Sequence, residues 1–120
     1  MKKILVVDDE SAIAEAIQLN IESLGRYKVL TELRGSCVIE TAKKFQPNLI
    51  LMDIMMPDIT GVDVAKALKG ISELRTTRVV FITSMLKKGE EQKNIDGMQA
   101  IFAKPIGKSD LVAIFKQEFG

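Results

Sequence analysis

Acidic residues stand at two places where the sequence changes from apolar to polar. Asp53 directly follows the continuous apolar run 49–52, and the triplet Asp8-Asp9-Glu10 follows the run 4–7. Short, unbroken apolar runs are typical of central strands that are covered on both faces of a parallel sheet. Asp53 is then expected as the first residue past the buried part. Because ligands bind at the carboxyl ends of such strands, both places are candidate functional positions.

Two further polar residues end later apolar segments. Thr83 closes the β-rich run 78–83, and Lys104 follows the short run 100–103. A hydroxyl donor and a cation at one edge of a sheet would hold anionic oxygens. Pro105 allows a cis peptide bond that would aim Lys104 into the site. Each residue alone also has an ordinary interpretation: Thr83 as a β-branched strand residue, Lys104 as a solvated lysine, and Asp53 as the start of a turn.

Brought together, these side chains could bind a metal ion and a phosphoryl group. Three carboxylates within a few ångströms repel one another, and either a raised pKa or a hard cation relieves the repulsion. Mg²⁺ suits an open carboxylate site that leaves several waters in place. With Lys104, it would balance the charges of Asp8, Asp9 and Asp53. Phosphoryl transfer depends mainly on positioning and electrostatic stabilisation, so Asp53 is the candidate nucleophile that would become an acyl phosphate.

The elements that must position these residues alternate strictly along the chain. The sequence predicts strands at 3–7, 27–31, 48–53, 78–83 and 100–103, and helices at about 11–24, 36–45, 61–68, 88–96 and 109–119. Crossovers of helical length between parallel strands are right-handed and cover both faces of the sheet. We therefore expect an α/β fold, a doubly wound five-stranded parallel sheet with strand order 2-1-3-4-5. In that order the strands that end at Asp8 and Asp53 are neighbours, so their carboxylates converge.

Local signals mark the ends of the predicted helices. Ser11 or Asp9 could cap the first helix, and Gly25 stands where a left-handed C-terminal residue belongs. Thr60 and Ser109 are expected to cap the helices that begin beside them. These signals fix where each helix leaves the edge of the sheet that carries the polar residues.

Composition excludes several classes of function. The chain has 120 residues, 47% of them hydrophobic and 28% charged, which is typical of one globular domain, expected to span 1–120. Its formal net charge of +1 provides no long-range field to attract nucleic acid or an anionic membrane. The single cysteine, Cys37, cannot form an internal disulfide, and no apolar stretch suits a signal peptide or a membrane span. We therefore expect a cytoplasmic protein.

These motifs resemble one known family over essentially the whole chain. The sequence is similar to the receiver domains of two-component response regulators, the CheY-like family, at Asp8-Asp9, Asp53, Met56-Pro57, Gly61, Thr83 and Lys104-Pro105. The resemblance implies that a phosphohistidine on a sensor histidine kinase or a histidine phosphotransfer protein phosphorylates Asp53. It also implies a signalling domain that is not a classical enzyme, although it takes part in its own phosphorylation and dephosphorylation.

The same resemblance implies roles for the remaining residues. Mg²⁺ would be held by Asp9, Asp53 and the main-chain carbonyl of Met55, with Asp8 acting through water. Thr83 would move to the phosphoryl group and Lys104 would bind it. The change would alter a face formed by the helix at 88–96, the last strand and the last helix, where a downstream protein or output domain would bind.

One position departs from the pattern of the family. Three residues before the lysine the family commonly has Tyr or Phe, whose inward turn accompanies the threonine shift, whereas this chain has Ile101. Phe102 is adjacent, but successive strand residues point to opposite faces, so Phe102 is expected to face away from the surface that Ile101 occupies. The aromatic part of the usual switch is therefore missing from its usual position.

Lysines accompany the expected partner face. They are Lys87, Lys88, Lys93 and Lys108. Such charges form either an ordinary solvated surface or a docking surface for a partner that prefers one state. By the resemblance, the first helix would be the element on which the kinase docks.

Other classes of function compete with phosphoryl acceptance. The same fold could act as a protein interaction module that works without phosphorylation. The complete set of acidic residues, Thr83 and Lys104 argues against this alternative, whereas the departure at Ile101 leaves it open. An FMN-dependent electron carrier would need a phosphate-binding loop after the first strand, where the Asp8-Asp9-Glu10 triplet would repel phosphate. A phosphatase with an aspartate nucleophile resembles a pattern with a second Asp two residues on, where this chain has Met55.

Overall fold

Five parallel strands form the centre of the molecule. The computed structural model describes residues 1–87 and 100–120, so the helix predicted at 88–96 lies outside the described residues. The strands are β1 (Lys2–Val7), β2 (Tyr27–Glu32), β3 (Leu49–Asp53), β4 (Arg78–Thr83) and β5 (Ile101–Ala103). They lie in the order β2-β1-β3-β4-β5, and every neighbouring pair is parallel. The predicted fold class and strand order are confirmed.

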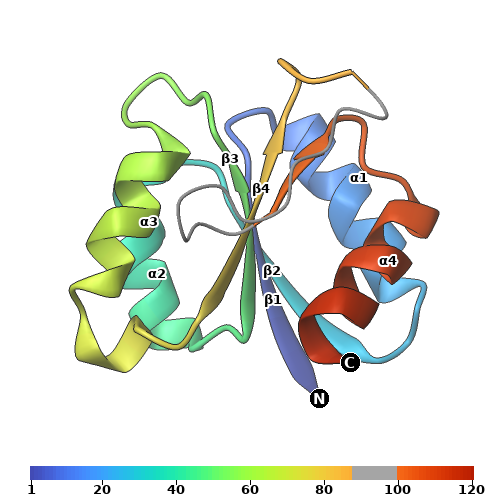
Figure 1. Ribbon diagram of the computed structural model, residues 1–120, viewed down its shortest axis with the longest axis horizontal. Coiled ribbons are helices and arrows are strands. Elements are labelled where there is room, and N and C mark those ends of the chain that lie inside the picture. Colours follow the sequence, from blue (N-terminus) through green and yellow to red (C-terminus); the bar gives the residue numbers. More distant parts are fainter. Residues whose placement is uncertain (88–99) are drawn as a thin grey trace.

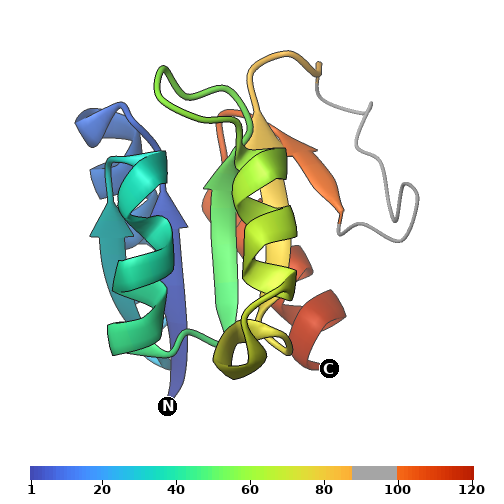
Figure 2. The same ribbon diagram turned by 90° about the vertical axis from the view of Figure 1, so that its left-hand side faces the viewer.

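Helices cover both faces of this sheet. The described helices are α1 (Ser11–Glu22), α2 (Val38–Phe45), α3 (Gly61–Lys69) and α4 (Lys108–Phe119), with 3₁₀ turns η1 (Gly35–Cys37) and η2 (Ser72–Leu74). Figure 1 shows α2 and α3 on one side of the sheet and α1 and α4 on the other. Figure 2 looks onto the side that carries α2 and α3. None of the helices among the described residues is long and apolar enough to cross a lipid bilayer.

The continuous apolar runs of the central strands are buried from both sides, as the sequence predicts. In β1, Ile4 and Val6 belong to the core cluster with α1 and α4, whereas Leu5 and Val7 belong to the cluster with α2 and α3. β3 divides in the same way, because successive strand residues point to opposite faces. The two hydrophobic layers hold the strands rigidly, so the residues at their carboxyl ends are fixed relative to one another.

The ends of the helices agree only partly with the predictions. Thr60 caps α3 as predicted, because its Oγ1 accepts a hydrogen bond from the backbone N–H of Asp63 at 3.2 Å. Glu10 is the N-terminal cap residue of α1, and it makes no capping hydrogen bond through its side chain. The cap residue of α4 is Gly107, whose N–H donates to Asp110 Oδ2 at 2.9 Å. The predictions of caps at Ser11 or Asp9 and at Ser109 are therefore wrong.

Candidate functional site

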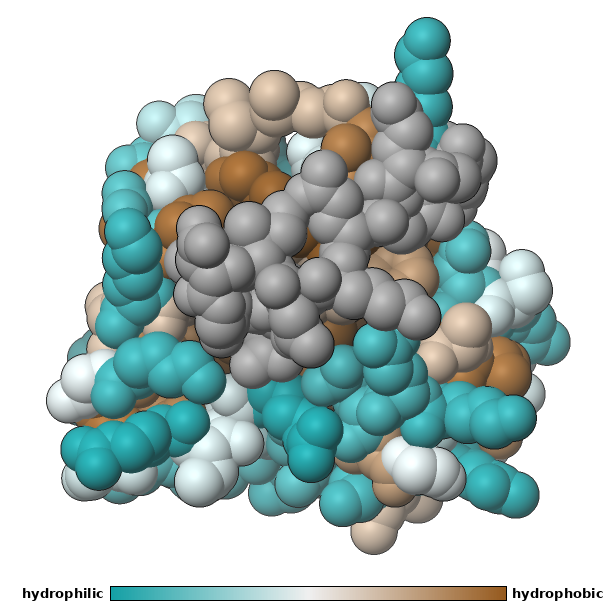
Figure 3. Space-filling model, viewed as in Figure 1, coloured by the Kyte–Doolittle hydropathy of each residue, from teal (hydrophilic) through white to brown (hydrophobic). Residues whose placement is uncertain are grey.

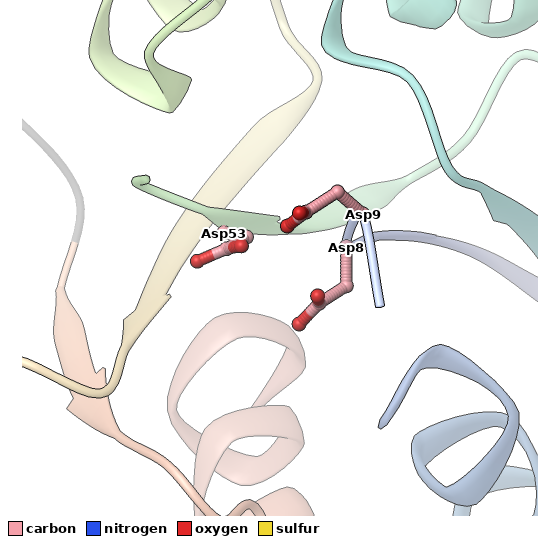
Figure 4. A group of neighbouring side chains, drawn as sticks. All are labelled: Asp8, Asp9 and Asp53. Atoms are coloured by element: carbon pink, nitrogen blue, oxygen red, sulfur yellow. The ribbon is translucent and has the colours of Figure 1, made fainter. Parts of the chain in front are cut away.

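Three carboxyl groups meet where β1 and β3 end. One oxygen from each of Asp8, Asp9 and Asp53 can be chosen so that all three atoms lie within 4.8 Å of one another. Figure 4 shows these carboxyl groups facing a common space, with Asp8 and Asp9 coming from the end of β1 and Asp53 from the end of β3. β1 and β3 are paired in the sheet, which brings residues far apart in the sequence side by side. The predicted convergence of the three carboxylates is confirmed.

The three carboxyl groups differ in their access to solvent. Asp8 is 0% exposed and Asp53 is 3% exposed, whereas Asp9 is exposed. The expectation that Asp53 is the first residue beyond the buried part of its strand is wrong, because Asp53 is the last residue of β3 and is itself buried. We expected a carboxylate to lie where the strand leaves the buried interior. A buried cation nearby compensates the charge of Asp53, so the strand stays buried up to its last residue.

Lys104 supplies that cation from the end of β5. Its Nζ lies 2.6 Å from Asp8 Oδ2 and 3.2 Å from Asp53 Oδ1, and its side chain is only 9% exposed. The peptide bond between Lys104 and Pro105 is cis, as the sequence allows. The structure therefore brings Lys104 into contact with two of the three carboxylates, and its charge is shared between them.

Lys104 and one backbone amide hold the two oxygens of Asp8. Asp8 Oδ1 accepts a hydrogen bond from the backbone N–H of Glu10 at 3.0 Å. Asp8 Oδ2 is buried, and its partner among the described residues is the Lys104 ammonium group at 2.6 Å. Because Lys104 also contacts Asp53, one positive charge serves two buried carboxylates.

The proximity of these groups changes their proton affinities. Burial, and then the neighbouring charge of Asp8, raise the pKa of Asp53 to about 6, although Lys104 opposes the shift. Burial by itself disfavours the charge on Lys104, but its contacts with Asp8 and Asp53 outweigh burial and raise the pKa of Lys104. At neutral pH the lysine is therefore charged, and Asp53 is mostly ionised although the site opposes its charge.

The donors present fit a hard divalent cation. All the side-chain ligands are carboxylate oxygens, which Mg²⁺ prefers over nitrogen or sulfur. Two carboxylates are buried and the third faces solvent, so the cluster is open on one side to the waters that Mg²⁺ retains. The single charge of Lys104 leaves the three carboxylates with an excess negative charge that a divalent ion would neutralise.

Thr83 ends β4 beside this cluster. It is 3% exposed, and its Oγ1 accepts a hydrogen bond from the backbone N–H of Met85 at 3.1 Å. β4 pairs with β3, and Asp53 lies opposite Ile82 in the register, one residue before Thr83. Since a hydroxyl that accepts one bond can still donate another, Thr83 keeps a proton available for an anionic oxygen.

The loop from β3 to α3 is held close to the cluster by contacts that the sequence alone did not reveal. The Gly61 N–H donates to Ile54 O at 2.8 Å, and a Cβ atom at Gly61 would lie 2.3 Å from Asp53 O. The Ser36 N–H donates to Asp58 Oδ2 at 2.9 Å, and this bond lowers the pKa of Asp58. Gly61 belonged to the recognised motif, but only its position against the end of β3 explains why glycine is needed there.

Hydrophobic side chains are exposed near the ends of β3 and β4. Met55 is 58% exposed and Met85 is 72% exposed. On the face visible in Figure 3, hydrophobic groups gather towards the top and mostly hydrophilic groups cover the lower part. Two methionines beside the carboxylate cluster thus provide apolar surface next to a polar site.

Ile101 and Phe102 point to opposite faces of β5, as predicted. Ile101 is partly buried against the core cluster of α2 and α3, and Phe102 packs against the cluster of α1 and α4. Phe102 is therefore on the wrong face to replace the aromatic residue that Ile101 lacks.

Two of the four lysines expected around a partner face lie in the described residues. Lys87 and Lys108 are exposed. Lys88 and Lys93 lie outside the described residues, as does the helix expected to carry them. The composition of the whole face therefore stays a prediction.

Comparisons with known proteins agree with this arrangement. Residues 4–116 match the family described as the response regulator receiver domain. The polar-differentiation response regulator DivK of Brucella anthropi is 31% identical over 120 residues, covering 99% of this chain and 97% of that protein. The DivK protein of Brucella ovis gives the same identity and coverage.

Solved structures show the same fold. The chemotaxis protein CheY4 of Vibrio cholerae superposes with a TM-score of 0.84 at 24% identity, covering 99% of each chain. A CheY-like receiver domain from Methylobacillus flagellatus gives a TM-score of 0.83 at 21% identity, covering 98% of each chain. At this level of identity, the structural likeness supports the arrangement of strands and helices.

Proposed function

The chain belongs to the response regulator receiver domain family, whose members are signalling domains rather than classical enzymes, and we propose that it accepts a phosphoryl group on Asp53. The donor would be the phosphohistidine of a sensor histidine kinase or of a histidine phosphotransfer protein. Members of this family interact with histidine kinases and downstream targets, which supports this donor. We place the transfer in the cytoplasm.

One observation carries the assignment to Asp53. Among the three clustered carboxylates, Asp53 is buried at the end of a central strand, contacts Lys104 at 3.2 Å, and lies next to the end of β4 that carries Thr83. Asp9 is exposed, and Asp8 is enclosed and paired with Lys104 at 2.6 Å. Asp53 therefore combines a cation, a hydroxyl and the neighbouring carboxylates, which suits a nucleophile that becomes an acyl phosphate.

In the proposed reaction a carboxylate oxygen of Asp53 forms a bond to phosphorus while the phosphorus–nitrogen bond of the phosphohistidine breaks. The electron pair of that bond stays on the imidazole. Lys104 would hold one of the phosphoryl oxygens, and Thr83 would donate its hydroxyl proton to another. Because the phosphoryl group carries more negative charge than the carboxylate it replaces, both contacts become stronger after transfer.

Mg²⁺ would be held by Asp9, Asp53 and the main-chain carbonyl of Met55, with Asp8 acting through water. When bound, it would neutralise negative charge on the carboxylates and on the phosphoryl oxygens, which otherwise repel each other. The excess of three carboxylates over the single charge of Lys104 supports this role. The phosphorylated state would then be recognised through the face formed by the segment before β5, β5 itself and α4.

The test is phosphorylation with acetyl phosphate in the presence of Mg²⁺, followed by intact mass measurement. We expect the mass of one added phosphoryl group, its loss on addition of a chelator, and its absence in Asp53→Asn. Asp63→Asn, an exposed carboxylate on α3, is the matched control and should be phosphorylated normally. Phosphoryl mass on Asp53→Asn, or none on the unaltered chain, would contradict the proposal.

A second candidate is an interaction module that works without phosphorylation. The specific observation in its favour is Ile101, an aliphatic side chain packed against the α2 and α3 core where an aromatic switch residue would be expected. Partner affinity measured on the unmodified and phosphorylated protein separates the two functions. Equal affinities would favour the second candidate, and a clear difference would favour a phosphorylation switch.

A further inference from the structure

A pocket lies at the opposite edge of the sheet from the carboxylate cluster. Its volume is about 920 Å³, within the range of roughly 300–1,000 Å³ that small-molecule sites occupy. It is lined by residues at the starts of β1, β2 and β3 and by the C-terminal part of α4. Since β1 runs from Lys2 to Val7, the two sites are separated by roughly 20 Å along the strand.

Aromatic rings form the floor of this pocket. The ring centroids of Tyr27 and Phe115 are 4.4 Å apart, and Phe119 lies 6.4 Å from Tyr27 and 6.0 Å from Phe115. Phe115 is buried, whereas Tyr27 and Phe119 are only partly covered. The exposed Val112, on the same helix, extends the apolar lining. These surfaces would receive the flat apolar part of a ligand.

The rim of the pocket is cationic. Lys2, Arg26 and Lys116 are exposed residues that line it, and none of the lining side chains, all of them in the described part of the chain, is acidic. Lys2 Nζ lies 5.1 Å from the centroid of the Phe119 ring, so a cation and an aromatic ring stand side by side in the pocket. Glu118, on the same helix as Lys116, is paired with Arg78 at 3.6 Å. The charges on the rim are therefore available to an anion.

Asn48 adds a polar side chain to the lining of the pocket. Its Oδ1 accepts a hydrogen bond from the backbone N–H of Lys3 at 2.8 Å, which fixes the direction of the amide. The amide nitrogen remains a donor for a ligand oxygen. The pocket therefore combines an aromatic floor, three cationic side chains and an oriented donor, a combination that favours a ligand with one flat apolar part and one anionic group.

We propose that this pocket binds a small aromatic anion, such as a nucleotide or an aromatic carboxylate. A nucleotide and an aromatic carboxylate share the same chemistry. Each has a planar ring that would pack against Tyr27 and Phe119, and a negatively charged oxygen that would pair with Arg26 and Lys116. The pocket is independent of phosphoryl acceptance, because it shares no residue with the carboxylate cluster. Binding is consequently expected to be the same in Asp53→Asn, and failure of one proposal leaves the other standing.

The first experiment is a fluorescence titration of the full chain with 8-anilinonaphthalene-1-sulfonate, an aromatic sulfonate, in the presence of Mg²⁺. We expect saturable binding that weakens as salt is added, because exposed charges are screened. Amide resonances of Tyr27, Asn48 and Lys116 should shift on titration, and those of Asp53 and Thr83 should not. Absence of saturable binding, or shifts confined to other regions, would overturn the proposal.

Charge reversals provide the matched comparison. Arg26→Glu and Lys116→Glu should each weaken binding by roughly three- to tenfold, the scale expected for reversing one exposed charge. Lys66→Glu, an exposed lysine on α3, should leave the affinity unchanged. Circular dichroism verifies that each variant is folded. Equal affinities in all three variants would refute a role for the cationic rim.

Competition identifies the source of the anion. Displacement of the dye by adenosine monophosphate alone would indicate a nucleotide, and displacement by indole-3-acetate alone would indicate an aromatic carboxylate. Displacement by both supports the shared chemistry. If neither displaces it, or if only an acidic peptide does, the assignment to a small aromatic anion is wrong.

Discussion

The carboxyl group of Asp53 is buried beside Asp8 in the folded chain and surrounded by water in the unfolded chain. Its pKa is about 6 when folded, against an ordinary value of 3.8. The folded state therefore binds this proton more tightly, and ionisation of Asp53 reduces stability as the pH rises through the interval between the two values. A difference of about two units corresponds to roughly 3 kcal/mol. The cost is largely present above about pH 6 and has nearly vanished at about pH 3.

We expect Asp53→Asn to raise the free energy of unfolding of the metal-free protein by about 1–3 kcal/mol near neutral pH, because it removes a buried charge. The gain should be close to zero at about pH 3, where the carboxyl group is mostly protonated in both states. Urea unfolding in the presence of a chelator at the two pH values measures it. Glu15→Gln, an exposed residue of α1, is the control and should change little. An equal gain at both pH values would show that the charge is not the cause.

A methyl group at Gly61 would collide with the strand end that carries the proposed phosphoacceptor. The added Cβ would lie 2.3 Å from Asp53 O, 2.9 Å from Met52 Cγ and 3.1 Å from Asp53 C. Because two of these atoms belong to the backbone of a central strand, they cannot move aside without displacing Asp53. Overpacking of this kind costs about 1–3 kcal/mol.

Gly61→Ala is therefore expected to lower the free energy of unfolding by that amount and to slow phosphorylation of Asp53. Gly70→Ala is the matched substitution, because the nearest atom to its added Cβ would be Ala67 O at 3.5 Å. We expect it to be neutral or slightly stabilising. Urea unfolding and the rate of mass increase with acetyl phosphate test both variants. Equal effects of the two substitutions would be inconsistent with the close approach at Gly61.

At the scale of elements, the turn η1 is attached to the loop between β3 and α3 through Ser36 and Asp58. The Ser36 N–H donates to Asp58 Oδ2, and this bond lowers the pKa of Asp58. The contribution of the bond is therefore present above the ordinary pKa of Asp58 and is lost as the pH falls through its lowered value. The loop also carries Met55, the proposed metal ligand.

Asp58→Ala is expected to increase the hydrogen exchange rate of the Ser36 amide several-fold, because the amide loses its acceptor. Asp58→Asn keeps an acceptor without the charge and should give an intermediate rate. Nuclear magnetic resonance of the exchanging amides measures both. An unchanged rate in Asp58→Ala would mean that the contact does not protect Ser36 in solution.

The elements themselves could be predicted from the sequence because their signals are local. Unbroken apolar runs identified β1 and β3, and Thr60 identified the start of α3. The starts of α1 and α4 could not be found in the same way, since their cap residues, Glu10 and Gly107, make no capping hydrogen bond through a side chain. The sequence predicts one helix over 36–45, because the 3₁₀ turn runs directly into α2 and no residue pattern separates Cys37 from Val38.

The members of the candidate site were predictable, but their environment was not. The ends of parallel strands lie at one edge, so Asp8, Asp9 and Asp53 could be placed together from strand order alone. The burial of Asp53 depends on the length and direction of the Lys104 side chain. The contact of Ser36 with Asp58 joins two loops with no periodic pattern, and no local signal predicts it.

At the scale of the whole molecule, the proposed metal binding would be coupled to folding through the carboxylate cluster. The cluster exists only when β1 and β3 are paired, so Mg²⁺ held there would bind the folded chain and stabilise it. At a Mg²⁺ concentration about twenty times the dissociation constant, the free energy of unfolding would rise by about 1.8 kcal/mol. Protonation of Asp53 competes with the metal, so the gain should decrease as the pH falls below about 6.

We expect Mg²⁺ to raise the midpoint of urea unfolding at neutral pH without changing the slope of the transition. The effect should be absent in Asp9→Asn and complete in Asp63→Asn, an exposed carboxylate outside the cluster. Its disappearance near pH 4 would agree with competition by protons. Equal stabilisation of both variants would instead indicate a general salt effect.

The position of the two chain ends has a practical consequence. Figure 1 places both at the edge of the sheet away from the carboxylate cluster, and Met1 and Gly120 line the aromatic pocket. An affinity tag or a fluorescent fusion at either end would therefore lie away from the carboxylate cluster while crowding the aromatic pocket. A tagged preparation could be phosphorylated normally and still fail to bind an aromatic anion, and cleavage of the tag would restore that binding.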